Sequence, residues 1–375
     1  MQFTPVLAPR ADDPARTEAF IPTPAVQNHA ATLHELPDGT LLATWFGGTQ
    51  EGVPDISVHL ARLEPGADRW SDAQVLSDDP TRSEQNPLLW TAPDGALWLL
   101  WTAQLGGNQD TAIVRRRISR DGGRSWGPIT TLLDTPGLFI RAPIVVARDG
   151  AWLLPVWRCT KPEGGAWTGD LDTSSVMVSE DAGATWVEHP VPDSLGAVHM
   201  AIVDAGEDYV AFFRSRRADF VQVARSADGR AWSAPAPLAL PNNNSSVCAA
   251  RLASGRIALV CNHSSRQDAT GRRLSLYDDI EGGEEEAQVS EGAFWGAPRA
   301  PLTLALSEDG GRTFPHRRNL EEGDGFCMTN NSKDKLNREF SYPSVIQGRD
   351  GRLHIAFTFW RQAIKHVTLH EEWAL

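Results

Sequence analysis

Short apolar runs recur along the chain, and each of them follows a turn. The turn is Asp-Gly or a related pair of small polar residues, and the fourth and fifth copies are the weakest. The six turns are Asp38-Gly39, Asp94-Gly95, Asp149-Gly150, Glu207-Asp208, Ser254-Gly255 and Asp350-Gly351. Asp-Gly between apolar runs is a strong hairpin signal, because glycine adopts positive φ without steric conflict. The pattern therefore predicts a chain built from β-hairpins.

A second, polar motif alternates with these hairpins. It has the form Ser-x-Asp-x-Gly-x-x-Trp, in which the Asp and Ser side chains can bond to backbone amides of a tight turn and the aromatic residue packs between strands. Copies occupy residues 119–126, 179–186, 226–232 and 307–314, and a degenerate copy lies around 64–70. The third copy is one residue shorter, and the fourth ends in Phe314. We interpret this motif as structural rather than catalytic.

The two motifs alternate six times at roughly the spacing of about 40–60 residues that is typical of propeller blades. We therefore predict an all-β, six-bladed β-propeller with four-stranded antiparallel blades, formed by residues 1–375 as a single domain. The last repeat has room for only two or three strands, so we expect the segment from Phe3 to Leu7 to complete that blade. A seventh blade between Gly255 and Phe314 is the alternative. We expect the acidic run at about 278–292 to be a solvated insertion.

Composition and charge narrow the function. The chain has 14 Trp, 32 Gly and 25 Pro but only 3 Tyr, which suits many short strands and turns. A net charge of -13 leaves no broad basic surface, so we expect no nucleic acid as a partner. No apolar run reaches the length of a membrane span, and no signal peptide is visible, so we expect no membrane association and a cytoplasmic protein. For a chain trimmed of its leader, a periplasmic or secreted location is the alternative.

The four cysteines are scattered and form no CxxC pair. Cys159, Cys248, Cys261 and Cys327 are therefore expected to be buried thiols. No other metal-ligand spacing is visible, and we expect neither a metal nor a cofactor.

The four clear Ser-x-Asp-x-Gly-x-x-Trp copies are Asp boxes, and with them the chain resembles the sialidase-like, BNR-repeat β-propeller superfamily over essentially its whole length. Strings at 28–33, 45–52, 340–347 and 361–366 strengthen the resemblance. Sialidases of this superfamily hold the substrate carboxylate with three arginines and use a Tyr–Glu nucleophile pair and an Asp acid/base. Their first arginine normally lies in an Arg-Ile-Pro string, but the corresponding stretch here, 25–30, contains His29 and no arginine.

A second branch of the superfamily resembles this pattern better. It contains lyases such as the rhamnosyl-glucuronate lyases, which use His with Tyr or Arg in place of two carboxylates. The resemblance implies an exo-acting enzyme that cleaves a glycosidic bond at a carboxylated, uronate-type sugar by β-elimination, with a glycan as its partner. The first alternative is a sialidase-type retaining hydrolase with Tyr342 as nucleophile. The second is a non-catalytic glycan-binding propeller.

Candidate catalytic residues are those that titrate near neutral pH or match the family's nucleophile position. His29 and His199 lie at expected strand starts, where imidazole groups can act as acid or base. Tyr342 precedes Pro343, which restricts the backbone beside it. Arginines beside apolar strand residues are expected to hold a carboxylate, and amide-rich loops to hold sugar hydroxyl groups. For hydrolysis, Glu51 and Asp55 of the first-blade loop are the candidate acid and partner. The expected substrate-binding residues are Asn28, Glu51, Asp55, Arg141, Arg158, Arg214, Asn243, Asn244, His263 and Arg361.

Overall fold

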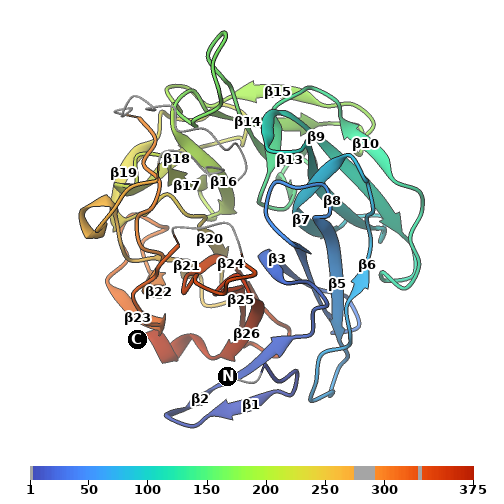
Figure 1. Cartoon of the computed structure of the whole chain (residues 1–375), viewed down its shortest axis with the longest axis vertical. Coiled ribbons are helices and arrows are strands. Elements are labelled where there is room, and N and C mark those ends of the chain that lie inside the picture. The colour runs from blue at the N-terminus through green and yellow to red at the C-terminus, as the bar shows by residue number, and fades with distance from the viewer. Residues whose placement is uncertain (1–2, 274–291, 328–331) are drawn as a thin grey trace.

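The computed structural model describes residues 3–273, 292–327 and 332–375. Apart from its last residue, the predicted acidic insertion at 278–292 lies outside the described residues. Those residues form six antiparallel sheets arranged as blades around a central axis, which confirms the six-bladed propeller (Figure 1). Among them, no helix has the length and hydropathy that a membrane span requires.

The first three blades follow one another along the chain, and in each the first strand lies nearest the axis. Blade 1 contains β3 (Gln27–Glu35), β4 (Leu41–Gly48), β5 (Ser57–Leu63) and β6 (Gln74–Val75). Blade 2 contains β7 (Arg82–Thr91), β8 (Leu97–Leu105), β9 (Asn108–Ser119) and β10 (Thr130–Leu133). Blade 3 contains β11 (Leu138–Ile140), β12 (Val145–Val146), β13 (Trp152–Arg158), β14 (Thr173–Ser179) and β15 (Val187–Pro190).

The other three blades complete the ring. Blade 4 contains β16 (Ala197–Asp204), β17 (Tyr209–Ser215), β18 (Phe220–Ser226) and β19 (Ala236–Pro241). Blade 5 contains β20 (Cys248–Arg251), β21 (Ile257–Asn262), β22 (Leu302–Ser307) and β23 (His316–Glu321). Blade 6 contains β24 (Phe340–Gln347), β25 (Leu353–Phe359), β26 (Ala363–Leu369), β2 (Asp13–Ile21) and β1 (Ala8–Arg10). Short 3₁₀ helices occupy Arg266–Asp268 (η1) and Glu371–Ala374 (η2).

The start of the chain closes the last blade, as predicted, but through a different segment. The strand that pairs with β26 is β2, not the segment from Phe3 to Leu7. Phe3 instead packs its ring against Phe20, 4.7 Å away. The apolar pattern pointed to the wrong segment because β2 carries charged residues that are buried in ion pairs, so its sequence does not look like a core strand.

Buried ion pairs join β2 to β26 of its own blade and to β23 of blade 5. The Lys365 ammonium on β26 lies 2.6 Å from Glu18 on β2 and 2.5 Å from Glu321 on β23. Arg16 on β2 pairs with both carboxylates. Breaking one partner of such a buried pair leaves an uncompensated charge, which is strongly destabilising. The closure of the ring therefore depends on buried charge as well as on strand pairing.

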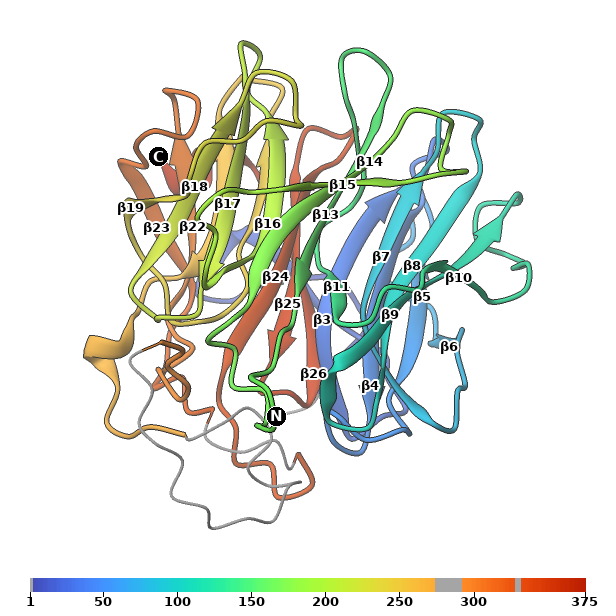
Figure 2. The ribbon, with the colours of Figure 1, turned by 90° about the horizontal axis from the view of Figure 1, so that it is seen from above.

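The two sequence motifs lie at the same end of the propeller. Each Asp-Gly or related turn joins the first and second strands of its blade, and each Asp box joins the third and fourth. In an antiparallel blade these connections share one end. The opposite end carries the beginnings of the first strands, the ends of the second strands and η1, at the bottom of Figure 2.

Each Asp box is a closed hydrogen-bonded turn whose glycine touches the preceding blade. In the box of blade 5, the Gly311 amide donates to Ser307 Oγ at 2.8 Å, and the Thr313 amide donates to Asp309 Oδ1 at 2.9 Å. Gly311 has φ +82°, and a Cβ at this position would lie 2.7 Å from the Phe212 ring of blade 4. Glycine is therefore required twice, by backbone conformation and by close packing.

We expect Gly311→Ala to lower the melting temperature more than Gly255→Ala does. Gly255 also has positive φ, at +87°, but a Cβ there would meet no atom within 4 Å. Both variants suffer the backbone strain, which is on the order of 1–2 kcal/mol, and only Gly311→Ala adds a clash with Phe212. Thermal unfolding of the two variants measures the difference. Equal melting temperatures would show that the contact between blades 4 and 5 adds nothing.

Candidate functional site

A backbone irregularity recurs where the first strands begin. Five blades place a non-glycine residue with positive φ there, a conformation that such residues rarely adopt. They are Ala30 (φ 59°), Asn86 (50°), His199 (53°), Asn244 (57°) and Tyr342 (51°). The strand register shifts at four of these positions, in β3, β7, β16 and β24. Such bulges redirect side chains and are common beside active sites.

Side chains from five blades line one cavity at this end of the propeller. Its volume is about 20 Å³, which holds about one water molecule. The lining residues are Glu51, Gln85, Asn86, Gln109, Phe139, Trp157, Trp167, His199, Arg214, Arg216 and Tyr342. Acid, base, amide and aromatic groups therefore meet at one point, although they are distant in the sequence.

Arg214 is the charged group at the centre of this arrangement. Its guanidinium is 1% exposed and donates to the Tyr342 hydroxyl at 2.6 Å and to Asn244 Oδ1 at 2.6 Å. A third contact joins its Nη1 to His199 Nε2 at 3.3 Å. Its Nη2 has no partner among the described residues, and no carboxylate there pairs with it. Burial lowers the pKa of Arg214 to about 9, because a buried charge without an opposite charge beside it is unfavourable.

His199 and Tyr342 flank Arg214, and both line the cavity. Their rings meet edge to face at 5.5 Å. Burial, followed by the charge of Arg214, holds the pKa of His199 well below its ordinary value. The imidazole is therefore neutral at neutral pH and keeps a lone pair.

His29 lies behind Tyr342 rather than against the cavity. The two ring centroids are 4.1 Å apart, and His29 Nδ1 contacts Thr358 Oγ1 at 2.8 Å. Burial, followed by the charge of Arg361, lowers the pKa of His29 well below 6.5. The structure thus brings His29 and Tyr342 together, but packs His29 against the tyrosine ring and not against the cavity.

Arg141 supports the strained backbone of Tyr342. Its Nη2 donates to the carbonyl oxygens of Tyr342, at 3.0 Å, and Pro343, at 3.2 Å. It also donates to Thr32 Oγ1 at 3.0 Å. The guanidinium therefore links blades 3, 1 and 6 through the backbone at the axis, and does not line the cavity.

A buried charge cluster lies on the other side of Tyr342, and sequence reasoning found only part of it. Arg361 pairs with Glu51 and, at 3.1 Å, with Glu339. Arg299 lies 3.2 Å from Glu339 and 5.6 Å from the Tyr342 ring. Burial would raise the pKa of Glu339, but Arg299 and Arg361 hold it below its ordinary value.

Arg299 and Glu339 were missed as site residues. One signal was available for Arg299: the string Arg-Ala-Pro occurs at 141–143 and again at 299–301. Glu339 gives no local signal, because only the tertiary structure places two arginines around it.

The remaining predicted residues lie outside the cavity. Arg158 does not reach it, and instead pairs with Glu188 at 2.8 Å on the partly exposed side of blade 3. Asn28 binds Trp45 Nε1 and backbone carbonyls, and Asn243 binds the Pro298 carbonyl. His263 is half-buried, and Asp55 accepts from the Thr49 amide in an exposed loop.

Two tryptophans cover the arginine side of the cavity. The Arg216 guanidinium lies 5.3 Å from the Trp167 ring and 5.2 Å from the Trp295 ring, and it is paired with Asp172 at 2.7 Å. Trp167 comes from the β13–β14 connection, and Trp295 from the β21–β22 connection. Segments of blades 3 and 5 therefore meet beside the arginines of the cavity.

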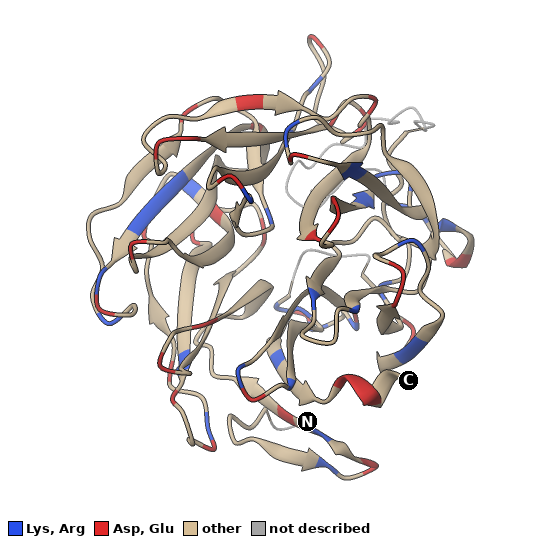
Figure 3. Ribbon diagram, turned by 180° about the vertical axis from the view of Figure 1, so that it is seen from behind, with Lys and Arg blue, Asp and Glu red and all other residues tan. Residues whose placement is uncertain are grey.

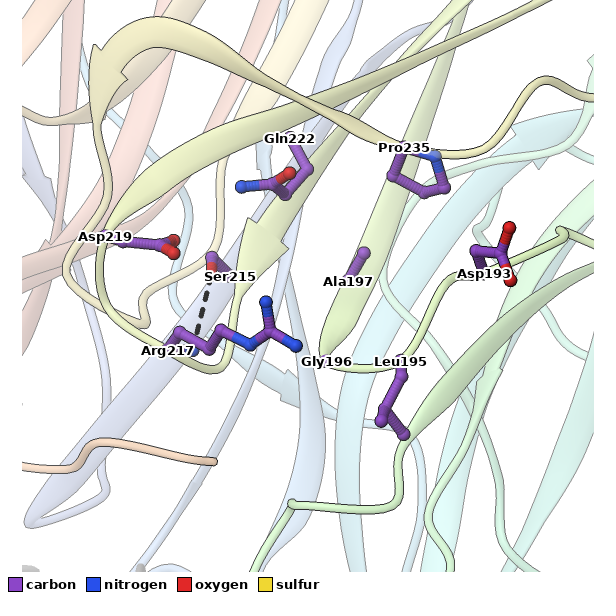
Figure 4. Close-up of a pocket in the computed structure, with 9 residues that line it drawn as sticks. All are labelled: Asp193, Leu195, Gly196, Ala197, Ser215, Arg217, Asp219, Gln222 and Pro235. Carbon is purple, nitrogen blue, oxygen red and sulfur yellow. Dashed lines mark hydrogen bonds between the residues drawn. The ribbon is translucent and has the colours of Figure 1, made fainter. Parts of the chain in front are cut away.

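A second hollow lies next to the cavity on blade 4, between the start of β16 and the β17–β18 turn (Figure 4). Its lining includes Arg217, Asp219 and Gln222, and Arg217 directly follows Arg216 of the cavity. The Ser215 hydroxyl accepts a hydrogen bond from the Arg217 amide. This hollow contains no histidine or tyrosine, so it can bind polar groups but offers no acid or base that titrates near neutral pH.

The charge around the cavity is positive although the chain is acidic. Among the described residues, the arginines there are Arg141, Arg214, Arg216, Arg299 and Arg361, and the carboxylates that face them are Glu51, Asp172 and Glu339. Elsewhere, basic and acidic residues are interspersed around the ring (Figure 3). The excess of arginine makes the cavity attractive to an anion. No three His, Cys, Asp or Glu side chains of the described segments gather to hold a metal ion.

Comparisons with known proteins agree with the fold. The family model described as "BNR repeat-like domain" matches residues 39–355. A search of curated proteins finds no match. A protein of unknown function from Dyadobacter fermentans superposes with a TM-score of 0.69 at 15% identity, covering 95% of this chain and 99% of that one.

Two further solved structures carry names that describe an activity. The Hadza microbial sialidase Hz136 gives a TM-score of 0.68 at 15% identity, covering 94% of this chain and 67% of that one. The intramolecular trans-sialidase from Ruminococcus gnavus, solved with oseltamivir carboxylate, gives 0.66 at 11% identity, with coverages of 92% and 95%. At these identities the likeness concerns the fold alone.

We expect the stability of the protein to fall as pH drops below about 6.5. His29, His199 and His366 are buried, and their pKa values lie well below the ordinary value in the folded state. These histidines therefore bind protons in the unfolded chain at a pH at which they remain neutral in the folded chain, so acid favours unfolding. Melting temperatures measured from pH 8 to pH 5, as approximate limits around the ordinary histidine pKa, test this. His199→Gln should flatten the decline, and an unchanged slope in that variant would contradict the assignment.

Proposed function

Because the chain belongs to the BNR repeat-like family, we propose that it is a carbohydrate-active enzyme that cleaves a glycosidic bond at a uronate-type sugar by β-elimination. The observation that carries this proposal is the buried Arg214 guanidinium, which lines the cavity without a carboxylate partner among the described residues. A planar guanidinium whose Nη2 has no partner among the described residues suits the carboxylate of a sugar. The carboxylate of the substrate would supply the missing anion.

The position of Arg214, the proposed carboxylate clamp, also determines where the base must lie. The proton removed in β-elimination is on C5, the carbon that bears the carboxylate, so the base must sit beside the guanidinium. His199 Nε2 lies 3.3 Å from Arg214 Nη1, and His199 is neutral because its pKa is lowered. When the carboxylate occupies Arg214, His199 Nε2 is released to take the C5 proton.

Tyr342 is placed to act as the acid. Its hydroxyl oxygen accepts from Arg214 at 2.6 Å, which leaves its own proton for another acceptor. In the step, the C5–H electron pair forms the C4=C5 double bond, the C4–O4 bond breaks, and O4 takes the proton of Tyr342. The products are an unsaturated uronate and the sugar that was attached through O4, so atoms and charge balance. Arg214 stabilises the enolate-like charge that develops on the carboxylate.

We expect ultraviolet absorbance from a conjugated double bond when the protein is incubated with oligosaccharides whose uronate carries a neutral sugar on O4. Tyr342→Phe and His199→Ala should each lower kcat by about 10²-fold or more, because each removes a proton-transfer group. Tyr209→Phe is the matched control. Tyr209 is buried in blade 4 and its hydroxyl accepts from the Arg148 amide at the opposite end of the propeller. Absorbance that persists in Tyr342→Phe would refute the assignment of the acid.

Arg214→Met should lower kcat/KM by about 10²-fold or more, because a desolvated charge pair with the carboxylate is lost. The measurement is steady-state cleavage of the same uronate oligosaccharide. Full activity in this variant would contradict the carboxylate clamp.

A sialidase-type retaining hydrolase is the second candidate. The observation that favours it is that Glu51 and Tyr342 line the same cavity, so that a carboxyl group and a nucleophile both reach one sugar. This reaction produces no double bond. Release of sialic acid from a fluorogenic sialoside, without an ultraviolet signal from uronate substrates, would favour the hydrolase. We expect that release to be weak or absent, because the strand start around Asn28 and His29 carries no arginine.

A further inference from the structure

The base of the proposed reaction is held by a stack of aromatic rings. Trp157 and Phe139 are cross-strand partners on β13 and β11 of blade 3, and their rings stack at 5.1 Å and 25°. The Trp157 ring stacks in turn on the His199 imidazole of blade 4, at 4.1 Å and 28°. The stack therefore crosses from one blade to the next and ends on the proposed base.

His199 needs this support because its own backbone does not favour one ring orientation. It lies at a bulge with φ +53°, where the strand register shifts between Val198 and Ala201. An imidazole rotates about its Cβ–Cγ bond unless packing prevents it. A rotation by half a turn exchanges the positions of its nitrogen and carbon atoms. Trp157 is 2% exposed and lies flat against the ring, so it restricts that rotation.

The hydrogen-bond chemistry assigns the tautomer. Arginine has five N–H donors and no acceptor. The contact between Arg214 Nη1 and His199 Nε2 therefore requires Nε2 to accept, and the neutral ring carries its proton on Nδ1. No described residue partners Nδ1. The stack holds the plane of the ring, and within that plane the contact with Arg214 presents the lone pair of Nε2 to the guanidinium.

We propose that Trp157 is a positioning residue that holds the His199 imidazole by stacking, with Nε2 toward Arg214 and the proton on Nδ1. The effect on catalysis rests on the proposed function. The orientation and the tautomer of the His199 imidazole do not depend on that function. With Phe139 and His199 stacked on its ring, Trp157 supports the base rather than offering a platform for a sugar.

The test compares two substitutions of Trp157 and one control. Trp157→Phe keeps an aromatic ring, and Trp157→Leu removes it. Trp152→Leu is the matched control, because Trp152 lies at the other end of β13 and packs against Trp90 and Trp98. Two-bond ¹H–¹⁵N spectra of ¹⁵N-histidine-labelled protein read the protonation of each ring nitrogen, and His199→Gln identifies the signal.

We expect His199 to carry its proton on Nδ1 in the wild type and in Trp157→Phe. In Trp157→Leu the signal should show mixed tautomers and titrate at higher pH, and kcat should fall by about 10-fold to 10²-fold with a smaller change in KM, as for a misplaced group. Trp152→Leu should lower the melting temperature and leave the His199 signal unchanged. If Trp157→Leu does not fold, Phe139→Leu, which removes the ring behind Trp157, should shift the signal in the same direction.

Two results would overturn the proposal: a proton on Nε2 in the wild type, or a His199 signal in Trp157→Leu identical to that of the wild type. Failure of the proposed function has a different signature. In that case the wild type cleaves no uronate oligosaccharide, while the nitrogen spectra still report whether Trp157 orients His199.

Discussion

The closed ring is the constraint on which the site depends. Five blades contribute side chains to the cavity, one each from blades 1 and 6 and three each from blades 2, 3 and 4. These side chains meet only when β2 pairs with β26 and brings blade 6 against blade 1. The contact between Arg361 of blade 6 and Glu51 of blade 1, and the contact between the His29 and Tyr342 rings, both cross this junction. A ring that opened there would separate the tyrosine from its supporting residues.

Buried charge is used in two opposite ways in this molecule. At the ring closure, the charges of Lys365, Glu18, Glu321 and Arg16 are paired with one another. At the cavity, Arg214 is bonded only to neutral groups among the described residues. An unpaired buried cation is unfavourable, and this is the feature on which the proposed carboxylate site rests. The arginines at the two places differ in their partners, and not in their degree of burial.

The two ends of the propeller differ in their backbone features. The Asp-Gly turns and Asp boxes lie at one end, where local hydrogen bonds and glycine contacts fix the blades to each other. The bulged strand starts lie at the other end, and five of the non-glycine residues with positive φ are at or beside the beginnings of these first strands. Strain of this kind persists only when the surrounding structure enforces it. Arg141, which bonds to the carbonyl oxygens of Tyr342 and Pro343, is part of that enforcement.

The sequence by itself determined the six blades, the turn that begins each hairpin and the Asp boxes, because each of these signals lies within a few consecutive residues. It also pointed to His199, Arg214 and Tyr342, which lie beside apolar strand residues. The tertiary structure alone decided which candidates meet. Arg214 and Tyr342 are 128 residues apart, and Arg361 and Glu51 are 310 apart. It also decided that Arg158 pairs at the outer side of blade 3, and that Glu339 and Arg299 belong to the site. Such contacts depend on how the whole ring closes, and no local pattern encodes them.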